Sequence, residues 1–205
     1  MKPKVVFIDW YKTLSNSVFW EHLENEDREK YDLIVNSFLK SFGDLINPWM
    51  RGKFTSEDMA KKIAEDTNLN EKYILDGLKK STQDMAFAED RIVDLIKQLR
   101  SNDTKVIVAT DNMDTFIRWT VPQMKLDKLF NGILNSWELK RLKGDFEGGS
   151  SKFFSKYLKA NSLSPAECLL IDDSEDKESR LSDFGINYVR INSTSDVVDI
   201  IVDLL

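Results

Sequence analysis

Four short apolar runs, each followed by polar residues, set the architecture that this chain can adopt. Apolar runs without alternation are typical of strands that are covered on both faces. Between the later runs, apolar residues recur at helical spacing, and strands that alternate with helices indicate a mostly parallel sheet within an α/β fold. The predicted strands span residues 4–8, 105–109, 168–171 and 187–191, and the predicted helices span 88–101, 149–160, 175–183 and 194–204.

The stretch from residue 17 to residue 85 has a different character. It contains no run of β-branched residues, and three segments within it have the pattern of amphipathic helices. Thr55 followed by Asp58 resembles the capping box of a helix start, and the Asn-Pro-Trp at 47–49 interrupts the helical pattern. We predict an α/β core formed by residues 1–16 and 86–205, with an all-helical insert at 17–85. Its three helical segments are 19–42, 55–67 and 70–81.

Composition excludes several classes of function. The 205 residues include 29 Lys and Arg against 35 Asp and Glu, a net charge of -6, which provides no basic field for nucleic acid or an anionic membrane. The single cysteine, Cys168, excludes an internal disulfide, and with one histidine it argues against a zinc site. The start MKPKVVFID lacks the apolar segment and cleavage site of a signal peptide, and no run of 18 uncharged apolar residues occurs, so we expect neither a signal peptide nor a membrane span. We expect a cytoplasmic protein of undetermined oligomeric state.

Polar residues close three of the predicted strands. In an open parallel sheet, ligands bind beyond the carboxyl ends of the strands, so these residues are the first candidates for a site. A carboxylate there can attack phosphorus or carbon, while further carboxylates can bind Mg²⁺. The residues are Asp9 after the first strand, Thr110, Asp111 and Asn112 after the second, and Asp172 and Asp173 after the third.

Attack by a carboxylate on an anionic phosphate meets like-charge repulsion, which a metal ion and fixed donors must offset. Asp9 is placed to be the nucleophile, and it can bind Mg²⁺ together with Asp172 and Asp173. Thr110 can donate a hydroxyl hydrogen bond to the anion. A lysine would complete the charge balance, and Lys143 and Lys152 are the two candidates.

Four segments occur in the order of the four motifs of the haloacid dehalogenase-like (HAD) superfamily, which this chain therefore resembles. They are VVFIDWYKTLS, VIVATDN, SWELKRLK and CLLIDDS, and they extend from residue 5 to residue 174. The resemblance implies a Rossmann-like sheet whose helical cap is inserted after the first motif, as residues 17–85 are here. It also implies a hydrolase that acts through an aspartate nucleophile.

The resemblance further implies individual roles. Asp9 is the nucleophile, Thr13 is an orienting hydroxyl in the first loop, and Thr110 contacts the phosphate. Asp172 and Asp173 are the acidic pair near Mg²⁺. The family commonly has a serine seven positions before its lysine, and the separation of Ser136 from Lys143 matches that spacing. Lys143 is thus favoured, while the longer glycine-rich loop that follows keeps Lys152 as an alternative. Asp111, Asn112 and Lys12 are further substrate-binding candidates.

Tyr11 and Lys12 depart from the family pattern. Phosphatases of the family have a second aspartate two residues after the nucleophile, where this chain has Tyr11. A tyrosine, with an ordinary pKa of about 10, is a poor general base at neutral pH. Lys12 replaces the usual glycine, which suggests either a different backbone path or a new positive charge beside the cleft.

Three functions remain open. Retention of Asp172 and Asp173 favours an Mg²⁺-dependent hydrolase of a small phosphorylated or other anionic metabolite. An aspartate followed two positions later by a tyrosine, as in Asp9 and Tyr11, resembles the 2-haloacid dehalogenases of the family, which use no metal. Phosphonate-cleaving relatives also lack the second aspartate, but they keep Mg²⁺ and use a cap lysine. The third alternative is a catalytically weakened member that binds a ligand or a partner protein. The lysines of the predicted cap include Lys40, Lys53, Lys61 and Lys62.

Structural readings compete with some functional ones. Asp172 and Asp173 can also serve as an N-cap pair for a helix starting in DDSEDKES, because acidic residues favour the positive end of a helix, and this role is compatible with metal binding. Three aromatic residues of the insert either line a substrate pocket or pack its helical core, as aromatic residues at helical spacing usually do. They are Phe19, Trp20 and Trp49.

Overall fold

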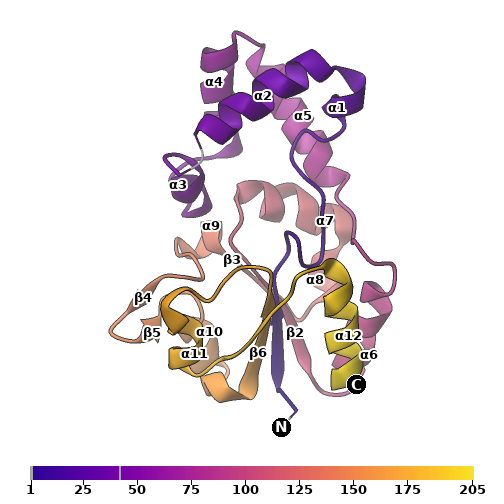
Figure 1. Cartoon of the computed structure of the whole chain (residues 1–205), viewed down its shortest axis with the longest axis vertical. Coiled ribbons are helices and arrows are strands. Elements are labelled where there is room, and N and C mark those ends of the chain that lie inside the picture. Colours follow the sequence, from indigo (N-terminus) through magenta and orange to yellow (C-terminus); the bar gives the residue numbers. More distant parts are fainter. Residues whose placement is uncertain (1, 42) are drawn as a thin grey trace.

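The computed structural model describes residues 2–41 and 43–205 and centres on a five-stranded sheet (Figure 1). The strand order is β3-β2-β1-β6-β7, and every neighbouring pair is parallel. Strand β1 is therefore central, with Val5 paired to Lys105 on one side and to Cys168 on the other. The strands are β1 (Val5–Ile8), β2 (Lys105–Thr110), β3 (Gly132–Asn135), β6 (Cys168–Asp172) and β7 (Asn187–Arg190).

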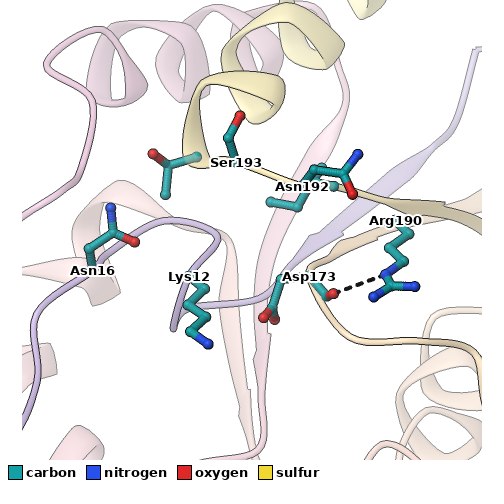
Figure 2. A pocket seen from close by; sticks show the side chains of 8 residues that line it. Lys12, Asn16, Asp173, Arg190, Asn192 and Ser193 are labelled. Atoms are coloured by element: carbon teal, nitrogen blue, oxygen red, sulfur yellow. Dashed lines mark hydrogen bonds between the residues drawn. The ribbon is translucent and has the colours of Figure 1, made fainter.

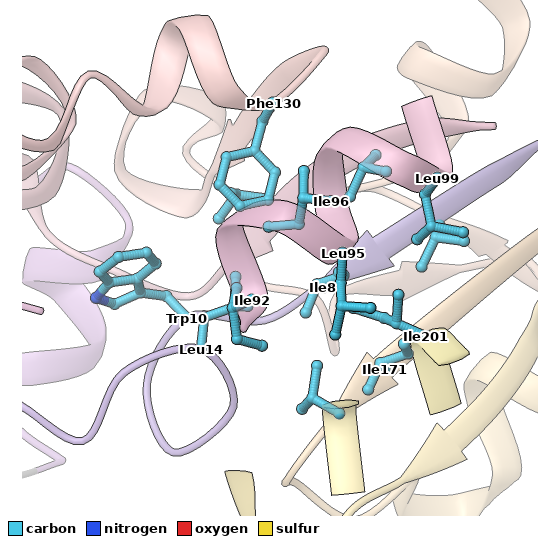
Figure 3. Close-up of a cluster of buried hydrophobic side chains, with 14 of the residues drawn as sticks. Ile8, Trp10, Leu14, Ile92, Leu95, Ile96, Leu99, Phe130, Ile171 and Ile201 are labelled. Atoms are coloured by element: carbon cyan, nitrogen blue, oxygen red, sulfur yellow. The ribbon is translucent and has the colours of Figure 1, made fainter. Parts of the chain in front are cut away.

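Helices cover both faces of the sheet, which explains why β1 is apolar throughout. Val6 and Ile8 pack into a core with helices α6 (Ile92–Ser101) and α12 (Thr194–Leu204), and Figure 3 shows Ile8 of this core together with side chains of both helices. Val5 and Phe7 point to the other face, where α10 (Ser155–Ala160) and α11 (Arg180–Phe184) lie. All four side chains of β1 are fully buried. The short helical elements that complete the core are Phe116–Thr120, α7 (Val121–Met124), α8 (Leu126–Leu129), α9 (Ser136–Leu139), Pro165–Glu167 and Lys177–Ser179.

The helical insert lies beyond the carboxyl end of β1, at the top of the view in Figure 1. Trp20 and Trp49 are fully buried in its centre, and the Trp20 indole donates a hydrogen bond of 2.9 Å to the carbonyl of Ile74. These aromatic residues therefore pack a helical core. The capping box of Thr55 and Asp58 is confirmed. The helices are α1 (Leu23–Glu26), α2 (Arg28–Lys40), α3 (Ile46–Met50), α4 (Ser56–Thr67) and α5 (Glu71–Gln83).

Buried and half-buried polar contacts join the insert to the core of the protein. The carboxylate of Asp114, fully buried, accepts hydrogen bonds from the Trp49 indole at 2.7 Å and from the backbone amide of Ser56 at 3.0 Å. Arg51 forms a two-pronged ion pair with Asp145, with one N–O distance of 2.7 Å. These contacts hold the insert to the core at points that are distant in sequence from its ends.

Four sequence predictions need correction. Strand β3 was not predicted, and residues 47–49 lie inside α3 instead of interrupting a helix. The glycine-rich stretch at 143–152 contains a hairpin, β4 (Phe146–Glu147) and β5 (Ser150–Ser151), so the predicted helix at 149–160 begins only at Ser155. The helix predicted at 175–183 is interrupted, and α11 begins at Arg180.

The helix predicted at 19–42 corresponds to α1 and α2, and its last residue lies outside the described residues. Within the described ranges, no helix has the length and apolar character needed to cross a membrane.

Candidate active site

Asp9 is the residue that immediately follows the central strand. Its backbone amide donates to the carbonyl of Ile171 at 3.0 Å, which continues the sheet pairing and fixes the direction of the side chain. Only 6% of Asp9 is exposed, and its Oδ1 atom is buried without a hydrogen bond from the described residues. Burying an ionised carboxylate without donors is unfavourable, so this oxygen needs a cation nearby.

Lys143 supplies part of that positive charge. Its Nζ lies 3.0 Å from Asp9 Oδ1, as an ion pair without hydrogen-bond alignment, and it donates a short hydrogen bond to Asp172 Oδ2. All three side chains are at least nine-tenths buried. Lys152 lies elsewhere, in an ion pair with Glu147 on the β4–β5 hairpin. The structure therefore brings Lys143, and not Lys152, to Asp9.

Asp172 and Asp173 complete a cluster of three carboxylates with Asp9. One oxygen from each residue lies within 4.8 Å of the others, a spacing that a single cation can bridge. Asp172 ends β6 and accepts a hydrogen bond from the amide of Ser174 at 2.9 Å. The pair does not cap a helix, because Asp176 accepts the amide hydrogen bonds of Leu181 and Ser182 at the start of α11.

The end of β2 brings a second group of predicted site residues to the same edge. Thr110 is buried at the last position of the strand. Asp111 accepts a hydrogen bond of 2.9 Å from the backbone amide of Lys143, so it positions the lysine. Asn112 is tied to Ser136, whose hydroxyl accepts from the Asn112 amide at 2.9 Å and donates to its carbonyl at 3.0 Å.

Burial and mutual repulsion of the carboxylates change their acidity. Burial raises the pKa of Asp9 to about 7, which Lys143 opposes and Asp172 reinforces. Burial likewise raises the pKa of Asp111 to about 6 against the opposing charge of Lys143. Burial alone would lower the pKa of the Lys143 ammonium, but Asp9, Asp172 and Asp111 outweigh it and hold that pKa above its ordinary value. The lysine stays charged, and the cluster retains excess negative charge.

The loop after Asp9 presents its residues in different directions. Thr13 is fully buried, and its hydroxyl has no hydrogen-bond partner in the described part of the chain. Tyr11 is 43% exposed, and the Lys12 ammonium lies 5.4 Å from the centre of its ring. Lys12 has a φ of 57°, so this loop keeps the left-handed conformation that a glycine adopts freely, at a cost of about 1 kcal/mol.

Sequence reasoning missed several residues around the site. Asp114 and Arg51 attach the insert, and neither belongs to a strand end or a recognisable motif. A cavity of about 390 Å³ adjoins the carboxylate cluster at Asp173, and its lining includes Arg190 and Asn192 from the end of β7 (Figure 2). The polar residue that follows the fourth predicted strand, Asn192, is the sequence signal that points to this cavity.

Solved structures similar to this chain include HAD-family enzymes and dehalogenases. A HAD family enzyme from Bacteroides thetaiotaomicron is 19% identical over 98% of both chains with a TM-score of 0.74. A predicted HAD-like family hydrolase from Porphyromonas gingivalis is 14% identical over 100% of this chain and 98% of that one, with a TM-score of 0.72. The L-2-haloacid dehalogenase from Xanthobacter autotrophicus with covalently bound chloropropionic acid is 12% identical over 92% of this chain and 77% of that one, with a TM-score of 0.64.

No protein-family model matches the chain, and no curated protein matches it in sequence. At identities of this size the structural likeness shows the fold. The chain has the HAD-type α/β fold that its four motifs predict, including a helical insert after the first motif.

The Lys143 ion pairs predict a large difference between two lysine substitutions. Lys143→Met leaves two buried carboxylates without their cation, so the free energy of unfolding in EDTA at pH 8 should fall by about 3 kcal/mol or more. Lys152→Met removes an exposed pair and should cost less than about 1 kcal/mol. Urea denaturation of both variants measures the difference. Equal losses would contradict the placement of Lys143.

The raised pKa of Asp111 predicts a pH-dependent stability difference. Between about pH 4 and pH 6 the folded state holds a proton that the unfolded state releases, so this contribution to stability is lost as the pH rises. The variant Asp111→Asn has no titrating carboxyl at this position, so it does not lose this contribution as the pH rises. Its free energy of unfolding should therefore rise relative to wild type by roughly 1 to 2 kcal/mol across this window, discounted for partial exposure.

Urea denaturation in EDTA at several pH values tests this, together with ¹³C NMR titration of the Asp111 carboxyl. A carboxyl that titrates near pH 4 and a difference that stays flat with pH would both refute it.

Proposed function

We propose that this chain is a HAD-like hydrolase of the phosphatase type, acting on a small phosphorylated or similarly anionic metabolite. The observation that carries the proposal is the buried contact of Lys143 with both Asp9 and Asp172, beside Asp173, at the carboxyl ends of adjacent strands. In an open parallel sheet, ligands bind beyond the carboxyl ends of the strands, and these residues lie at that edge. The helical insert at 17–85 acts as a cap over it.

The residues present fit a bound Mg²⁺. Asp9 Oδ1 is buried and lacks a hydrogen bond, and it lies within reach of oxygens from Asp172 and Asp173. Hard carboxylate oxygens are ligands that Mg²⁺ prefers. A bound ion would supply positive charge to the phosphoryl oxygens. The Bacteroides enzyme supports this part of the proposal, because it has been crystallised with magnesium and inorganic phosphate.

The protein's own groups have distinct parts in the proposed reaction. Asp9 attacks phosphorus and forms an acyl phosphate while the bond from phosphorus to the leaving oxygen breaks, and that oxygen takes a proton from water. A second water then hydrolyses the acyl phosphate, which releases phosphate and regenerates Asp9. Lys143 favours the ionised form of Asp9 and offsets the charge of the incoming anion. Thr110 donates its hydroxyl to a phosphoryl oxygen. The Thr13 hydroxyl, which has no hydrogen-bond partner among the described residues, is available to orient the bound anion from the first loop.

Three other residues have supporting roles in the proposal. Asp111 holds the backbone of Lys143 in place through its accepted hydrogen bond. Asn112 and Lys12 are proposed substrate contacts, with the side-chain amide nitrogen of Asn112 and the ammonium of Lys12 as donors. Both kinds of group bind anions through charge or hydrogen bonding.

Tyr11 supports a second candidate, a carbon–halogen hydrolase. Halide leaves without a proton, so that reaction does not need the acid that Tyr11 replaces. The structural likeness to the Xanthobacter dehalogenase is compatible with it. We favour the phosphatase type because three carboxylates gather here, whereas a reaction without metal gains nothing from them. Halide release from short-chain 2-haloacids in EDTA would instead support the dehalogenase.

The third candidate is a weakened family member that binds a ligand or partner without turnover. Its motivation is again Tyr11, since loss of general acid–base help slows a reaction by about 100-fold to 10,000-fold. Robust turnover that depends on Asp9 would exclude it.

The proposal predicts Mg²⁺-dependent turnover of a phosphate ester through Asp9. A panel of small phosphate esters should be hydrolysed with Mg²⁺ and not with EDTA. Asp9→Asn should lower kcat at least about 1,000-fold because the amide is no nucleophile. Asp183→Asn, which changes an exposed aspartate on α11, is the control and should keep wild-type rates. Turnover unaffected by Mg²⁺ removal would contradict the proposal.

Replacing Tyr11 provides a test of the missing acid. Tyr11→Asp should raise kcat for phosphate esters with poor leaving groups by about 100-fold or more, since it restores a carboxyl that can protonate the leaving oxygen. Tyr11→Asn introduces a side chain of the same size as Asp that cannot act as an acid, so it should give no such gain in kcat. A comparison of kcat for phenyl and alkyl phosphates separates the two variants. Equal rates in both would show that the absent acid does not limit the reaction.

A further inference from the structure

A polar cavity of about 390 Å³ adjoins the carboxylate cluster at Asp173 (Figure 2). Its walls come from three separate parts of the chain: the loop after β1, the end of β6, and the connection from β7 to α12. The volume accommodates a phosphate or carboxylate group with its first waters. Its lining residues are Lys12, Asn16, Asp173, Arg190, Ile191, Asn192, Ser193 and Thr194.

Two cations face this cavity without carboxylate partners. Lys12 and Arg190 form no ion pair with any residue in the described ranges. Arg190 donates only its Nε, to the backbone carbonyl of Asp173 at 3.3 Å. This hydrogen bond orients the guanidinium and leaves both terminal nitrogens available. In Figure 2 the side chains of Lys12, Asp173 and Arg190 extend in the same direction from their three segments.

The composition of the walls favours an anion over a cation or an apolar group. The two cations outnumber the single carboxylate of Asp173, and Asn16 and Asn192 add side-chain amide donors. The start of α12 contributes little, because Asp196 already accepts the amide hydrogen bonds of Asn192 and Ser193 at 2.8 and 3.1 Å. The attraction therefore depends on Lys12 and Arg190, and an arginine fork suits the oxygens of phosphate or carboxylate.

We propose that this cavity is a second anion-binding site, separate from the reaction centre, which takes a phosphate or carboxylate group through Arg190 and Lys12. It adjoins the reaction centre through Asp173, which belongs to both the cavity wall and the carboxylate cluster. Two sources can supply such a group. One is a second anionic group on the substrate, and the other is a free anion that binds independently of the substrate.

The first test needs no catalysis and uses inorganic phosphate with the metal-free full chain. In EDTA the reaction centre holds several carboxylates against Lys143 and repels phosphate, while the cavity keeps its excess of cations. Titration followed by ¹H–¹⁵N NMR should shift the amides of residues 12, 16 and 190–194. Phosphate affinity should fall about 10-fold or more in Arg190→Gln and in Lys12→Gly.

The variants are chosen to stay folded. Lys12→Gly suits the left-handed backbone at this position, and Arg190 is an exposed residue at the end of its strand. Lys177→Gln is the matched control, because Lys177 is exposed and does not line the cavity. Shifts confined to Asp9, Thr110 and Lys143, or an affinity unchanged by the two cavity variants, would overturn the proposal.

The second test distinguishes the two sources and rests on the proposed function. With Mg²⁺, Arg190→Gln should raise KM about 10-fold for esters carrying a second anionic group and leave simple monophosphates unchanged, if the substrate supplies the anion. If a free anion is the ligand, phosphate binds the cavity while every KM stays the same. Absence of all turnover would refute the proposed function and leave the NMR result standing.

Discussion

The ammonium of Lys143 is the charge on which the arrangement of the site depends. It lies between Asp9 and Asp172, which leave the sheet at the ends of two neighbouring strands. Two carboxylates this close and this buried repel each other strongly unless a cation lies between them. Asp111 fixes the backbone of that lysine, so three strand ends are joined through one side chain. Because the carboxylates of the site outnumber this one ammonium, the cluster keeps a net negative charge that a metal ion can offset.

The attachment of the helical insert follows a similar principle. Asp114 is fully buried and binds the Trp49 indole and the Ser56 amide, while Arg118 forms an ion pair with it at 2.7 Å. A buried carboxylate with three donors is stable where an unpaired one would be costly. Trp49 packs at the same time in the aromatic core of the insert, against Phe19 and Phe38. Movement of the insert away from the core would therefore expose both an apolar cluster and a charge.

Local sequence patterns were sufficient to predict an element where one physical cause, such as burial or capping, determines it. The apolar run of β1 is buried on both faces, and the capping box of Thr55 is a contact within four residues. Strand β3 has only two large apolar residues, Ile133 and Leu134, and it lies half-buried at the edge of the sheet, so its pattern is weak. The hairpin at 146–151 did have a signal, since Gly148 and Gly149 provide the positive φ values that a tight hairpin turn needs.

The sequence by itself determined the class of fold and the residues at the strand ends, because burial of apolar runs and the chemistry of Asp, Thr and Lys are local properties. It left Lys143 and Lys152 as alternatives, since both are lysines in one glycine-rich stretch. Only the tertiary structure decided between them: the hairpin turns Lys152 towards Glu147, and Lys143 is directed inwards to Asp9. The pairing of Trp49 with Asp114 and the convergence of Lys12 with Arg190 were likewise decided there, because these contacts join segments that are distant along the chain.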